Sequence, residues 1–289
     1  MVSVIIPTTC ETARAQFLTR AIDSVIKQEG VLFEVLVVVN GDNVDQERFN
    51  CLFKSDKIKT IKVAEGNVSN ARYCGLLASR GDFFCFLDDD DELLDNSLFD
   101  RVSYLENNDK IDVVVSNGYV YSDTDELLID DKLADCVIAD PVAGFFLKNW
   151  FASAGPMFRR SKVDAELFNI KVRYYELTYL FFSIVSSLVE IKFINVIGYR
   201  IYTNHDVSAS RSDAYILAEA DVLLEISKLP LHLAIKKVIN LRHSSALHSI
   251  SQYFLCKNRL NEAWLAHLKC LRYGGWRYFS YTRHLLFRT

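Results

Sequence analysis

Apolar positions in the first half of the chain follow two alternating periods. Short runs that are almost continuously apolar predict buried strands, and segments with an apolar residue every three or four positions predict helices. The predicted strands are 2–6, 33–39, 58–63, 83–87 and 113–121, and the predicted helices are 17–28, 68–79 and 96–106. This alternation is typical of an α/β domain built around a mostly parallel sheet. Pro7 is expected to stop the first strand.

The second half of the chain is less regular. Acidic residues crowd 123–140, and the pattern there assigns no form. The remaining predictions are a short strand at 157–159, an apolar helix at 174–189, a strand, turn and strand around Gly198 within 191–202, and helices beyond Ser212.

Pro230 is the expected joint between two parts of the chain, 1–229 and 230–289. The whole chain has 289 residues and a net charge of −4. Ten Lys or Arg residues and one acid give the second part a charge of +9, which leaves −13 for the first. A composition of 50% hydrophobic and 24% charged residues excludes disordered and collagen-like classes. The sequence therefore predicts an acidic α/β domain followed by a basic helical region.

The cysteine pattern and the first residues of the chain bear on the cellular location of the protein. The seven cysteines are scattered without a CxxC pair, so neither a disulfide framework nor a zinc site is expected. No basic segment precedes the first apolar run, so no signal peptide is expected. The uncharged apolar run at 177–189 is shorter than the roughly 20 residues that cross a bilayer. These features favour a cytoplasmic protein.

Four consecutive aspartates, 88–91, follow the strand predicted at 83–87. Ligands of open α/β sheets bind outside the carboxyl ends of the strands. Adjacent carboxylates repel one another without a cation, and oxygen ligands suit Mg²⁺ or Mn²⁺ together with substrate phosphates. The cluster therefore predicts a metal site for a phosphorylated ligand. The alternative is a solvated acidic turn that starts the next helix.

Four segments carry a resemblance to a known family. VSVIIPTT, AIDSVIKQ, FEVLVVVNGDN and NARYCGLLASRGDFFCFLDDDDEL occur in order over roughly 1–125. Together they resemble the nucleotide-binding half of family 2 glycosyltransferases of the GT-A fold, with Asp88-x-Asp90 as the DxD motif. The resemblance implies a GT-A domain over 1–229, in which 1–125 binds the nucleotide sugar and 126–229 binds the acceptor.

The implied substrates are a nucleotide-diphosphate sugar, with a UDP-sugar as first choice, and an acceptor hydroxyl. A glycan or lipid-linked oligosaccharide in bacterial surface polysaccharide synthesis is the acceptor that the resemblance suggests. The implied cofactor is Mn²⁺ or Mg²⁺.

The resemblance places donor contacts after the first two strands. Pro7, Thr8 and Glu11 fall in the loop that holds the nucleoside, and the alternative for them is a plain turn. Asn40 or Asp42 occupies the position of a paired-acid turn that contacts the base.

The helix at 68–79 and the acidic cluster supply the diphosphate contacts. Arg72 lies in a match to A-R-N-x-G, where a guanidinium binds diphosphate or orients a carboxylate. Asp90 is the first-choice metal ligand and Asp88 the second, through ribose or a metal-bound water. Asp89 is assigned to substrate binding, and Asp91 either caps the next element or touches the acceptor sugar.

Family 2 enzymes invert the anomeric centre, so a general base must take the proton of the acceptor hydroxyl. Glu176 aligns with the first acid of a Glu-Asp pair at the start of a helix, and Leu177 replaces the second. Glu176 is therefore the expected base, with Asp140 and Asp164 as lesser candidates. His205 falls near a segment that closes over the donor, for a metal or diphosphate contact or a structural role.

The segment 272–289 mixes arginines with aromatic and aliphatic residues. Such a segment suits the surface of an anionic membrane, so peripheral contact with the cytoplasmic face of a membrane is one expectation. Packing of the aromatic residues on the acidic body is the alternative. Nothing resembling a nucleic-acid-binding module accompanies the basic residues, and no nucleic acid partner is expected.

Two other functions fit parts of the pattern. A phosphohydrolase of the haloacid dehalogenase type also places Asp-x-Asp at a strand end over Mg²⁺, although on its first strand rather than its fourth. A catalytically inactive nucleotide-sugar-binding module is the other alternative, because Leu177 stands where the second acid is usual.

Overall fold

The computed structural model describes residues 1–41, 44–54, 57–64, 66–203 and 212–287. The chain divides into two compact units. The first contains Met1–Lys171 and Ser187–Asp206, and the second contains Val172–Ser186 and Val207–Thr289. The boundary therefore lies before the predicted joint at Pro230, and a short internal segment also groups with the C-terminal helices.

The first unit contains the strands, nine among the described residues. They are β1 (Val2–Thr8), β2 (Phe33–Asn40), β3 (Ile58–Val63), β4 (Phe83–Phe86), β5 (Glu92–Leu93), β6 (Val113–Tyr121), β7 (Asp125–Leu127), β8 (Pro156–Arg159) and β9 (Ile191–Tyr202). Its helices are α1 (Ala15–Ile26), α2 (Gln46–Phe53), α3 (Val68–Ala78), α4 (Ser97–Glu106), α5 (Asp131–Ala139) and α6 (Pro141–Leu147), with 3₁₀ turns η1 (Thr12–Arg14) and η2 (Ala165–Phe168).

The second unit contains helices and no strand among its described residues. Its elements are α7 (Glu176–Ser186), α8 (Asp213–Lys228), α9 (Leu233–Cys256), α10 (Leu260–Arg272), η4 (Trp276–Tyr281) and α11 (Thr282–Leu286). None of the described helices has both the length and the apolar character needed to cross a bilayer.

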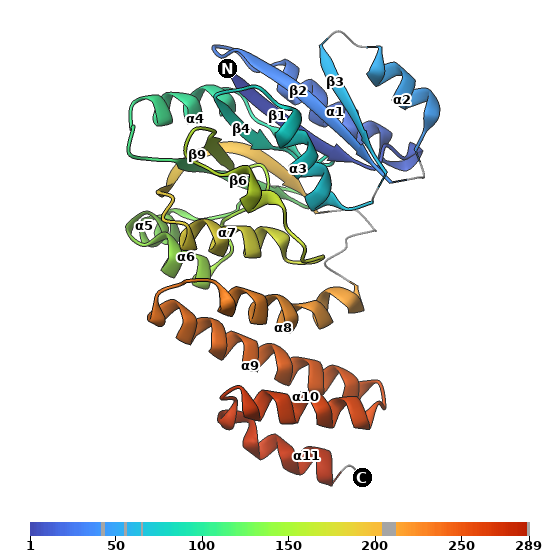
Figure 1. Cartoon of the computed structure of the whole chain (residues 1–289), viewed down its shortest axis with the longest axis vertical. Helices are drawn as coiled ribbons and strands as arrows, with labels where there is room; N and C mark the ends of the chain where they lie inside the picture. The colour runs from blue at the N-terminus through green and yellow to red at the C-terminus, as the bar shows by residue number, and fades with distance from the viewer. Residues whose placement is uncertain (42–43, 55–56, 65, 204–211, 288–289) are drawn as a thin grey trace. The chain divides into compact units, whose positions relative to one another are not determined.

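The described strands form one sheet in the order β3-β2-β1-β4-β8-β6-β9-β5, and β7 pairs with β6. Strands β1 to β4 are parallel, whereas β8 runs antiparallel to β4 and β6. Strand β1 has β2 on one side and β4 on the other, so the strand order reverses there (Figure 1). Ligands of open α/β sheets bind at such a reversal, outside the carboxyl ends of the strands.

Helices pack closely on β1, β2 and β4, which explains why these parallel strands are largely apolar on both faces. Leu18, Ala21 and Val25 of α1 are buried. Gly75 in α3 allows a close approach, because a Cβ atom at that position would lie 2.5 Å from Cγ2 of Ile5 in β1. A Cβ atom at Gly75 would also lie 2.9 Å from Cγ2 of Val38 in β2, so this packing positions α3 against β1 and β2.

The structure corrects the prediction that Pro7 stops the first strand. Strand β1 continues to Thr8, and Pro7 pairs in register with Val38. The amide of Leu87 donates to the carbonyl of Ile5, so Ile5 and Pro7 both direct their backbone polar groups toward β4. The ladder between β1 and β4 ends at Ile5. Pro7 therefore interrupts no hydrogen bond, which is the condition under which a strand tolerates proline.

The predicted strand, turn and strand within 191–202 is also wrong. Strand β9 is continuous but irregular: its partner on β6 changes from Ser116 opposite Ile194 to Asn117 opposite Ile197. Gly198 serves a close approach rather than a turn, because a Cβ atom there would lie 2.7 Å from Oγ of Ser116. The other strands and helices are confirmed within a few residues. The unassigned region 123–140 contains β7 and α5.

Candidate active site

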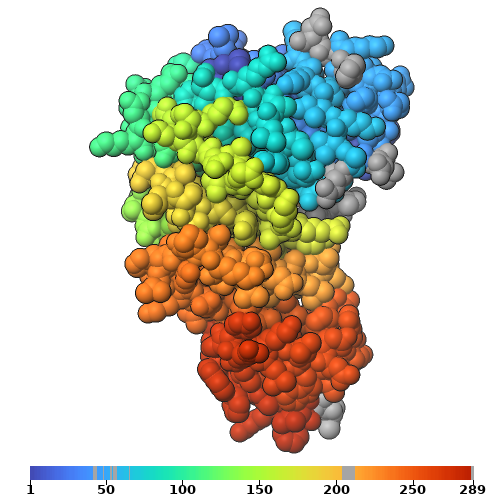
Figure 2. Space-filling view, viewed as in Figure 1, coloured from blue at the N-terminus to red at the C-terminus, as the bar shows by residue number. Residues whose placement is uncertain are grey.

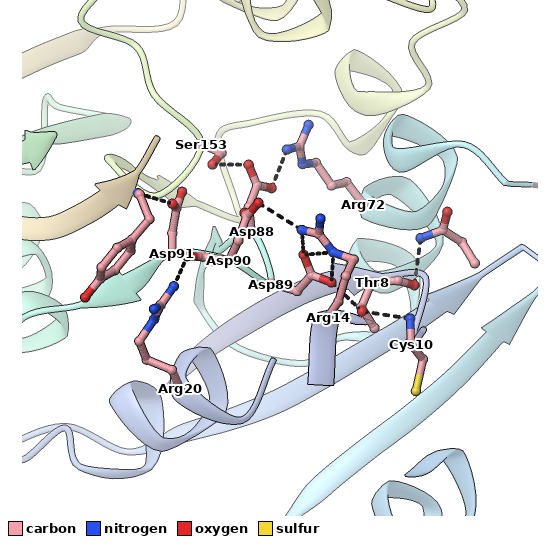
Figure 3. Close-up of polar contacts among 12 residues, drawn as sticks. Thr8, Cys10, Arg14, Arg20, Arg72, Asp88, Asp89, Asp90, Asp91 and Ser153 are labelled. Atoms are coloured by element: carbon pink, nitrogen blue, oxygen red, sulfur yellow. Dashed lines mark hydrogen bonds and ion pairs between the residues drawn. The ribbon is translucent and has the colours of Figure 1, made fainter. Parts of the chain in front are cut away.

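The four aspartates lie at the reversal of strand order. The amide of Leu87, directly after β4, donates to Ile5 of β1 at 3.0 Å, and the amide of Asp91 closes a turn on the carbonyl of Asp88 at 3.1 Å. Arginines approach the cluster from different elements: Arg72 reaches Asp88, and Arg14 reaches Asp89 and Asp90 (Figure 3).

Asp88 is held by two side chains. Nη2 of Arg72 donates to Oδ1 at 2.6 Å, and Oγ of Ser153 donates to Oδ2 at 2.7 Å. Arg72 projects from α3, a helix capped by Asn67, whose side chain accepts from the amide of Ser69 at 2.9 Å. Burial alone would raise the pKa of Asp88, but Arg72 and Ser153 outweigh it and hold that pKa below its usual range. Asp88 is therefore an ionised, fixed carboxylate.

Asp89 joins the cluster to β1. Oγ1 of Thr8 donates to its Oδ2 at 2.5 Å, and Nε of Arg14 donates to both of its carboxylate oxygens at 3.1 Å. Oγ1 of Thr8 also accepts from the amide of Cys10 at 2.9 Å, and Nδ2 of Asn40 donates to the carbonyl of Thr8 at 3.0 Å. The ends of β1, β2 and β4 are thus connected through polar side chains.

Asp90 contacts two arginines, one through its side chain and one through its backbone carbonyl. Nη2 of Arg14 donates to Oδ2 of Asp90 at 2.9 Å, and Arg20 of α1 donates to its backbone carbonyl. The guanidinium of Arg20 also stacks on Tyr202, 3.6 Å from the ring centre. Burial and the nearby charge of Asp88 raise the pKa of Asp90. A further positive charge at this carboxylate would favour its ionised form.

Asp91 is buried and connects the cluster to β9. Its Oδ1 accepts from the amide of Tyr202 at 3.2 Å. Burial, followed by the charges of Asp88 and Asp90, raises the pKa of Asp91 well above its usual range. The expectation that Asp91 caps the next element is wrong, because Asn96 occupies the N-cap of α4. A contact with the acceptor sugar stays a prediction.

Arginines compensate much of the repulsion among the four aspartates in this arrangement. Arg14 and Arg72 pair with three of the aspartates, and the raised pKa of Asp91 favours its neutral form. Arginines thus supply the cations that the acidic run requires in the free protein. Repulsion between the carboxylates therefore does not by itself demand a metal ion.

A divalent cation fits the site only with help from its substrate. In the described part of the chain, no three His, Cys, Asp or Glu side chains are arranged to hold a metal. Asp90 and Asp88 nevertheless offer oxygen donors, and burial together with the charge of Asp88 raises the pKa of Asp90. Two carboxylates plus phosphate oxygens and water are a typical environment for Mg²⁺ or Mn²⁺.

The other predicted site residues lie in the following places. Pro7 lies buried inside β1 rather than in a loop, and Glu11 follows β1, where its carbonyl accepts from the amide of Arg14 at 3.0 Å. Asp42 and His205 lie outside the described residues. Glu176 is the first residue of α7, in the second unit.

Both lesser candidates for the base cap helices. Asp140 accepts from the amides of Val142 and Ala143 at 3.0 and 2.9 Å at the start of α6. Asp164 accepts from the amide of Glu166 at 3.0 Å at the start of η2. These hydrogen bonds give both carboxylates a local structural role.

Three residues of the site escaped the sequence prediction. Arg14 and Arg20 follow β1 in a stretch whose sequence is typical of the start of a helix. The presence of two cations there was the one signal that could have suggested partners for the acidic run. Ser153 lies 65 positions from Asp88 and carries no local signal.

Comparisons with known proteins identify a family and agree with this fold. Residues 3–171 match the family described as Glycosyl transferase family 2. An uncharacterized glycosyltransferase of Rickettsia prowazekii is 31% identical over 119 residues, 41% of this chain and 36% of the relative. The uncharacterized glycosyltransferase EpsJ of Bacillus subtilis is 27% identical over 128 residues, 43% of this chain and 37% of the relative. The matched segments thus span about a third of the length of these relatives.

A solved structure supports the fold. Residues 1–349 of Staphylococcus aureus TarS in complex with UDP-GlcNAc superpose with a TM-score of 0.65 at 16% identity, covering 93% of this chain and 79% of that one. The family match extends over more than half of the present chain. The chain therefore belongs to glycosyl transferase family 2 and has the GT-A fold.

Proposed function

We propose that the enzyme transfers the sugar of a UDP-sugar to an acceptor hydroxyl with inversion, at the reversal between β1 and β4. The observation that carries the proposal is the cluster Asp88–Asp91, held by Arg72 and Arg14 at the carboxyl ends of these strands. The choice of UDP rests on the fold similarity to TarS, which was solved with UDP-GlcNAc.

Residues at the ends of β1 and β2 are the proposed nucleoside contacts, and Arg72 is the proposed diphosphate contact. Asn40 and Thr8 are tied together by a hydrogen bond, which pre-positions both before a donor arrives. Asp90, with Asp88, would hold Mg²⁺ or Mn²⁺, which when bound would neutralise charge on the departing diphosphate. The guanidinium of Arg72 has the fork geometry that suits phosphate oxygens.

Glu176 is the proposed general base. Its place as the first residue of α7 agrees with the family pattern of an acid at a helix start. In the proposed step, its carboxylate accepts the proton of the acceptor hydroxyl while the oxygen attacks the anomeric carbon. The bond from that carbon to the nucleotide diphosphate breaks on the opposite face.

Donor binding can be tested without knowing the acceptor. Thermal shifts of the full chain with UDP-, GDP-, dTDP- and CMP-sugars and Mn²⁺ should show the largest shift with a UDP-sugar. Asp90→Ala should abolish the Mn²⁺-dependent part of that shift while the protein stays folded. Equal shifts for wild type and Asp90→Ala, or an unchanged shift in excess chelator, would remove the metal assignment. Release of phosphate from phosphomonoesters would instead favour a phosphohydrolase.

The base assignment needs a matched control. Glu176→Gln should lower transfer by about 10²–10⁴-fold, the usual contribution of general base catalysis, with little change in donor affinity. Glu106→Gln makes the same change at an exposed position at the end of α4 and should be silent. Near-normal transfer by Glu176→Gln would exclude this residue as the base. Donor binding without turnover by the wild type would favour an inactive binding module.

The described part of the C-terminal segment, 272–287, has one buried side and one exposed side. Tyr278 stacks on His248 of α9, with ring centres 4.0 Å apart, and Leu285 is buried. Trp276, Phe279 and Phe287 remain exposed, although they are large and apolar. Figure 2 shows the surface of this segment in red. One side of the segment therefore packs within the second unit, while the exposed side carries aromatic residues.

We propose that this exposed side contacts an anionic membrane that carries a lipid-linked acceptor. Exposed cations accompany the aromatic residues, namely Arg272, Arg277 and Arg283. Each cation near an anionic surface contributes about 1 kcal/mol. The protein should float with vesicles containing phosphatidylglycerol but not with pure phosphatidylcholine. Exchanging Trp276 and Phe279 for Ser should reduce flotation, and equal flotation of the variant would contradict the proposal.

A further inference from the structure

Arg14 makes two kinds of contact within the acidic cluster. Its Nε donates to both oxygens of Asp89 at 3.1 Å, and its Nη2 pairs with Asp89 and, at 2.9 Å, with Oδ2 of Asp90 (Figure 3). The side chain of Asp89 is 6% exposed, whereas those of Arg14 and Asp90 are 29% and 26% exposed. One end of the contact is therefore buried, and the other end is open to solvent.

Asp89 acts as the anchor of this arrangement. Its Oδ2 accepts from Thr8 at 2.5 Å, and both oxygens accept from Arg14. A bidentate guanidinium contact of this kind fixes orientation as well as charge. Asp89 can therefore keep Arg14 in place after the single contact between Arg14 and Asp90 is broken.

Asp90 is the carboxylate that the proposed function needs for a metal ion. In the free protein its Oδ2 already pairs with Arg14, and this charge opposes the raised pKa that burial causes. A divalent cation that approaches Asp90 alone meets the positive guanidinium and is repelled. A cation that arrives with a diphosphate brings its own negative charge, so the repulsion is offset.

We propose that Arg14 is an exchangeable counter-ion of Asp90. Arg14 holds the Asp90 carboxylate in the donor-free enzyme and releases it when the metal and nucleotide bind together, while its contacts with Asp89 persist. Arg14 is thus a positioning residue that suppresses metal binding in the absence of nucleotide. This inference rests on the proposed function, because it assigns Asp90 to the metal.

The consequence is a coupling between the two ligands. If the guanidinium opposes metal binding only when no diphosphate is present, UDP must increase the affinity for Mn²⁺, and Mn²⁺ must increase the affinity for UDP by the same factor. Removing the charge of Arg14 should strengthen binding of Mn²⁺ alone and reduce that factor. A residue that only supports the fold of the site would weaken metal binding when it is replaced.

The test measures Mn²⁺ binding to the full chain, with and without saturating UDP, from the electron paramagnetic resonance signal of free Mn²⁺. Arg14→Gln should bind Mn²⁺ alone about tenfold more tightly than the wild type, the effect of roughly 1.4 kcal/mol. Arg80→Gln makes the same charge change at an exposed arginine and should match the wild type. Wild-type or weaker affinity of Arg14→Gln for Mn²⁺ alone would overturn the proposal.

A second variant covers the case in which Arg14→Gln does not fold. Arg14→Lys keeps the charge but cannot span Asp89 and Asp90 with a planar fork, so its affinity for Mn²⁺ alone should rise by about threefold, roughly 0.65 kcal/mol. An unchanged affinity, or no detectable Mn²⁺ binding by any variant even with UDP, would refute the exchange. Transfer and UDP binding by the wild type are measured separately, so failure of this inference is distinct from failure of the proposed function.

Discussion

The hydrogen bond from Thr8 to Asp89 joins β1 to the acidic cluster, and Thr8→Val removes it with little change of shape. Oγ1 of Thr8 lies 2.5 Å from Oδ2 of Asp89 and accepts from the amide of Cys10 at 2.9 Å. Thr8 is 2% exposed and Asp89 is 5% exposed, so water cannot replace either partner. Valine therefore leaves a buried carboxylate short of one donor and removes the hydrogen bond that the Cys10 amide donates to Thr8.

The magnitude follows from these two losses. A hydrogen bond to a charged group contributes about 1.5–3 kcal/mol, and an ordinary neutral hydrogen bond contributes about 0.5–1.5 kcal/mol. Because Arg14 still pairs with Asp89, we expect a loss below the upper end of the sum, about 2–4 kcal/mol of unfolding free energy. For a unit of this size, that loss lowers Tm by roughly 4–16 °C.

The assay is urea unfolding followed by far-UV circular dichroism, with Thr12→Val as the control. Oγ1 of Thr12 also donates to an aspartate, Asp45 at 3.0 Å, but in an exposed setting. Exposed interactions of this type contribute at most about 1 kcal/mol. If Thr8→Val and Thr12→Val reduce stability equally, or Thr8→Val stays within about 0.5 kcal/mol of the wild type, the structural role of this hydrogen bond is refuted.

Three further predictions concern other parts of the first unit. Arg72→Met should lower kcat/KM for the donor by roughly 10–150-fold, because Asp88 loses a charge-assisted hydrogen bond and the proposed diphosphate contact is removed, and unchanged kcat/KM in steady-state kinetics would contradict this role. Gly75→Ala should destabilise by about 1–3 kcal/mol through overpacking against β1, despite the better helix propensity of alanine, whereas Gly66→Ala, with no neighbour closer than 3.7 Å, should be nearly neutral in urea unfolding. Burial raises the pKa of Asp91 in the folded state, so the folded state binds this proton more tightly than the unfolded state, and the contribution of Asp91 to wild-type stability should decline as the pH rises above about 4 toward that raised pKa. In Asp91→Asn this decline should be smaller in urea unfolding between pH 4.5 and 8, and an identical pH dependence would argue against a buried, protonated Asp91.

The sequence predicts the parallel half of the sheet well because each strand there is an isolated apolar run. Strand β2, apolar on both faces, has a strand on either side, β3 and β1, although it lies only one strand from the edge of the sheet. Strand β9 was harder, because its irregular pairing with β6 depends on a register change that leaves no period in the sequence. Pro7 misled the prediction, since its tolerance depends on where the neighbouring ladder ends, which is a tertiary fact.

The candidate site shows the same division. The aspartates can be predicted because they form a run at the end of a strand, and Arg72 can be predicted because it lies in a family motif. The partners that determine their charge, Arg14 and Ser153, lie 75 and 65 positions away from their aspartates and have no local signature. Repulsion among the aspartates is therefore no sufficient reason for a metal ion, because the fold supplies arginines that the sequence pattern does not reveal, and the metal site stays a prediction.

Release of UDP from a UDP-sugar in Mn²⁺ tests the proposed site at β1 and β4. The rate is measured for the full chain and compared with Asp90→Asn and Glu106→Gln at equal concentration. Slow attack by water makes the assay independent of the acceptor. The proposed site at β1 and β4 predicts that the wild type and Glu106→Gln release UDP at equal rates and that Asp90→Asn loses at least about 100-fold, or roughly 2.7 kcal/mol of transition-state stabilisation. Equal release by Asp90→Asn, or no turnover of any nucleotide sugar by the wild type, would contradict it.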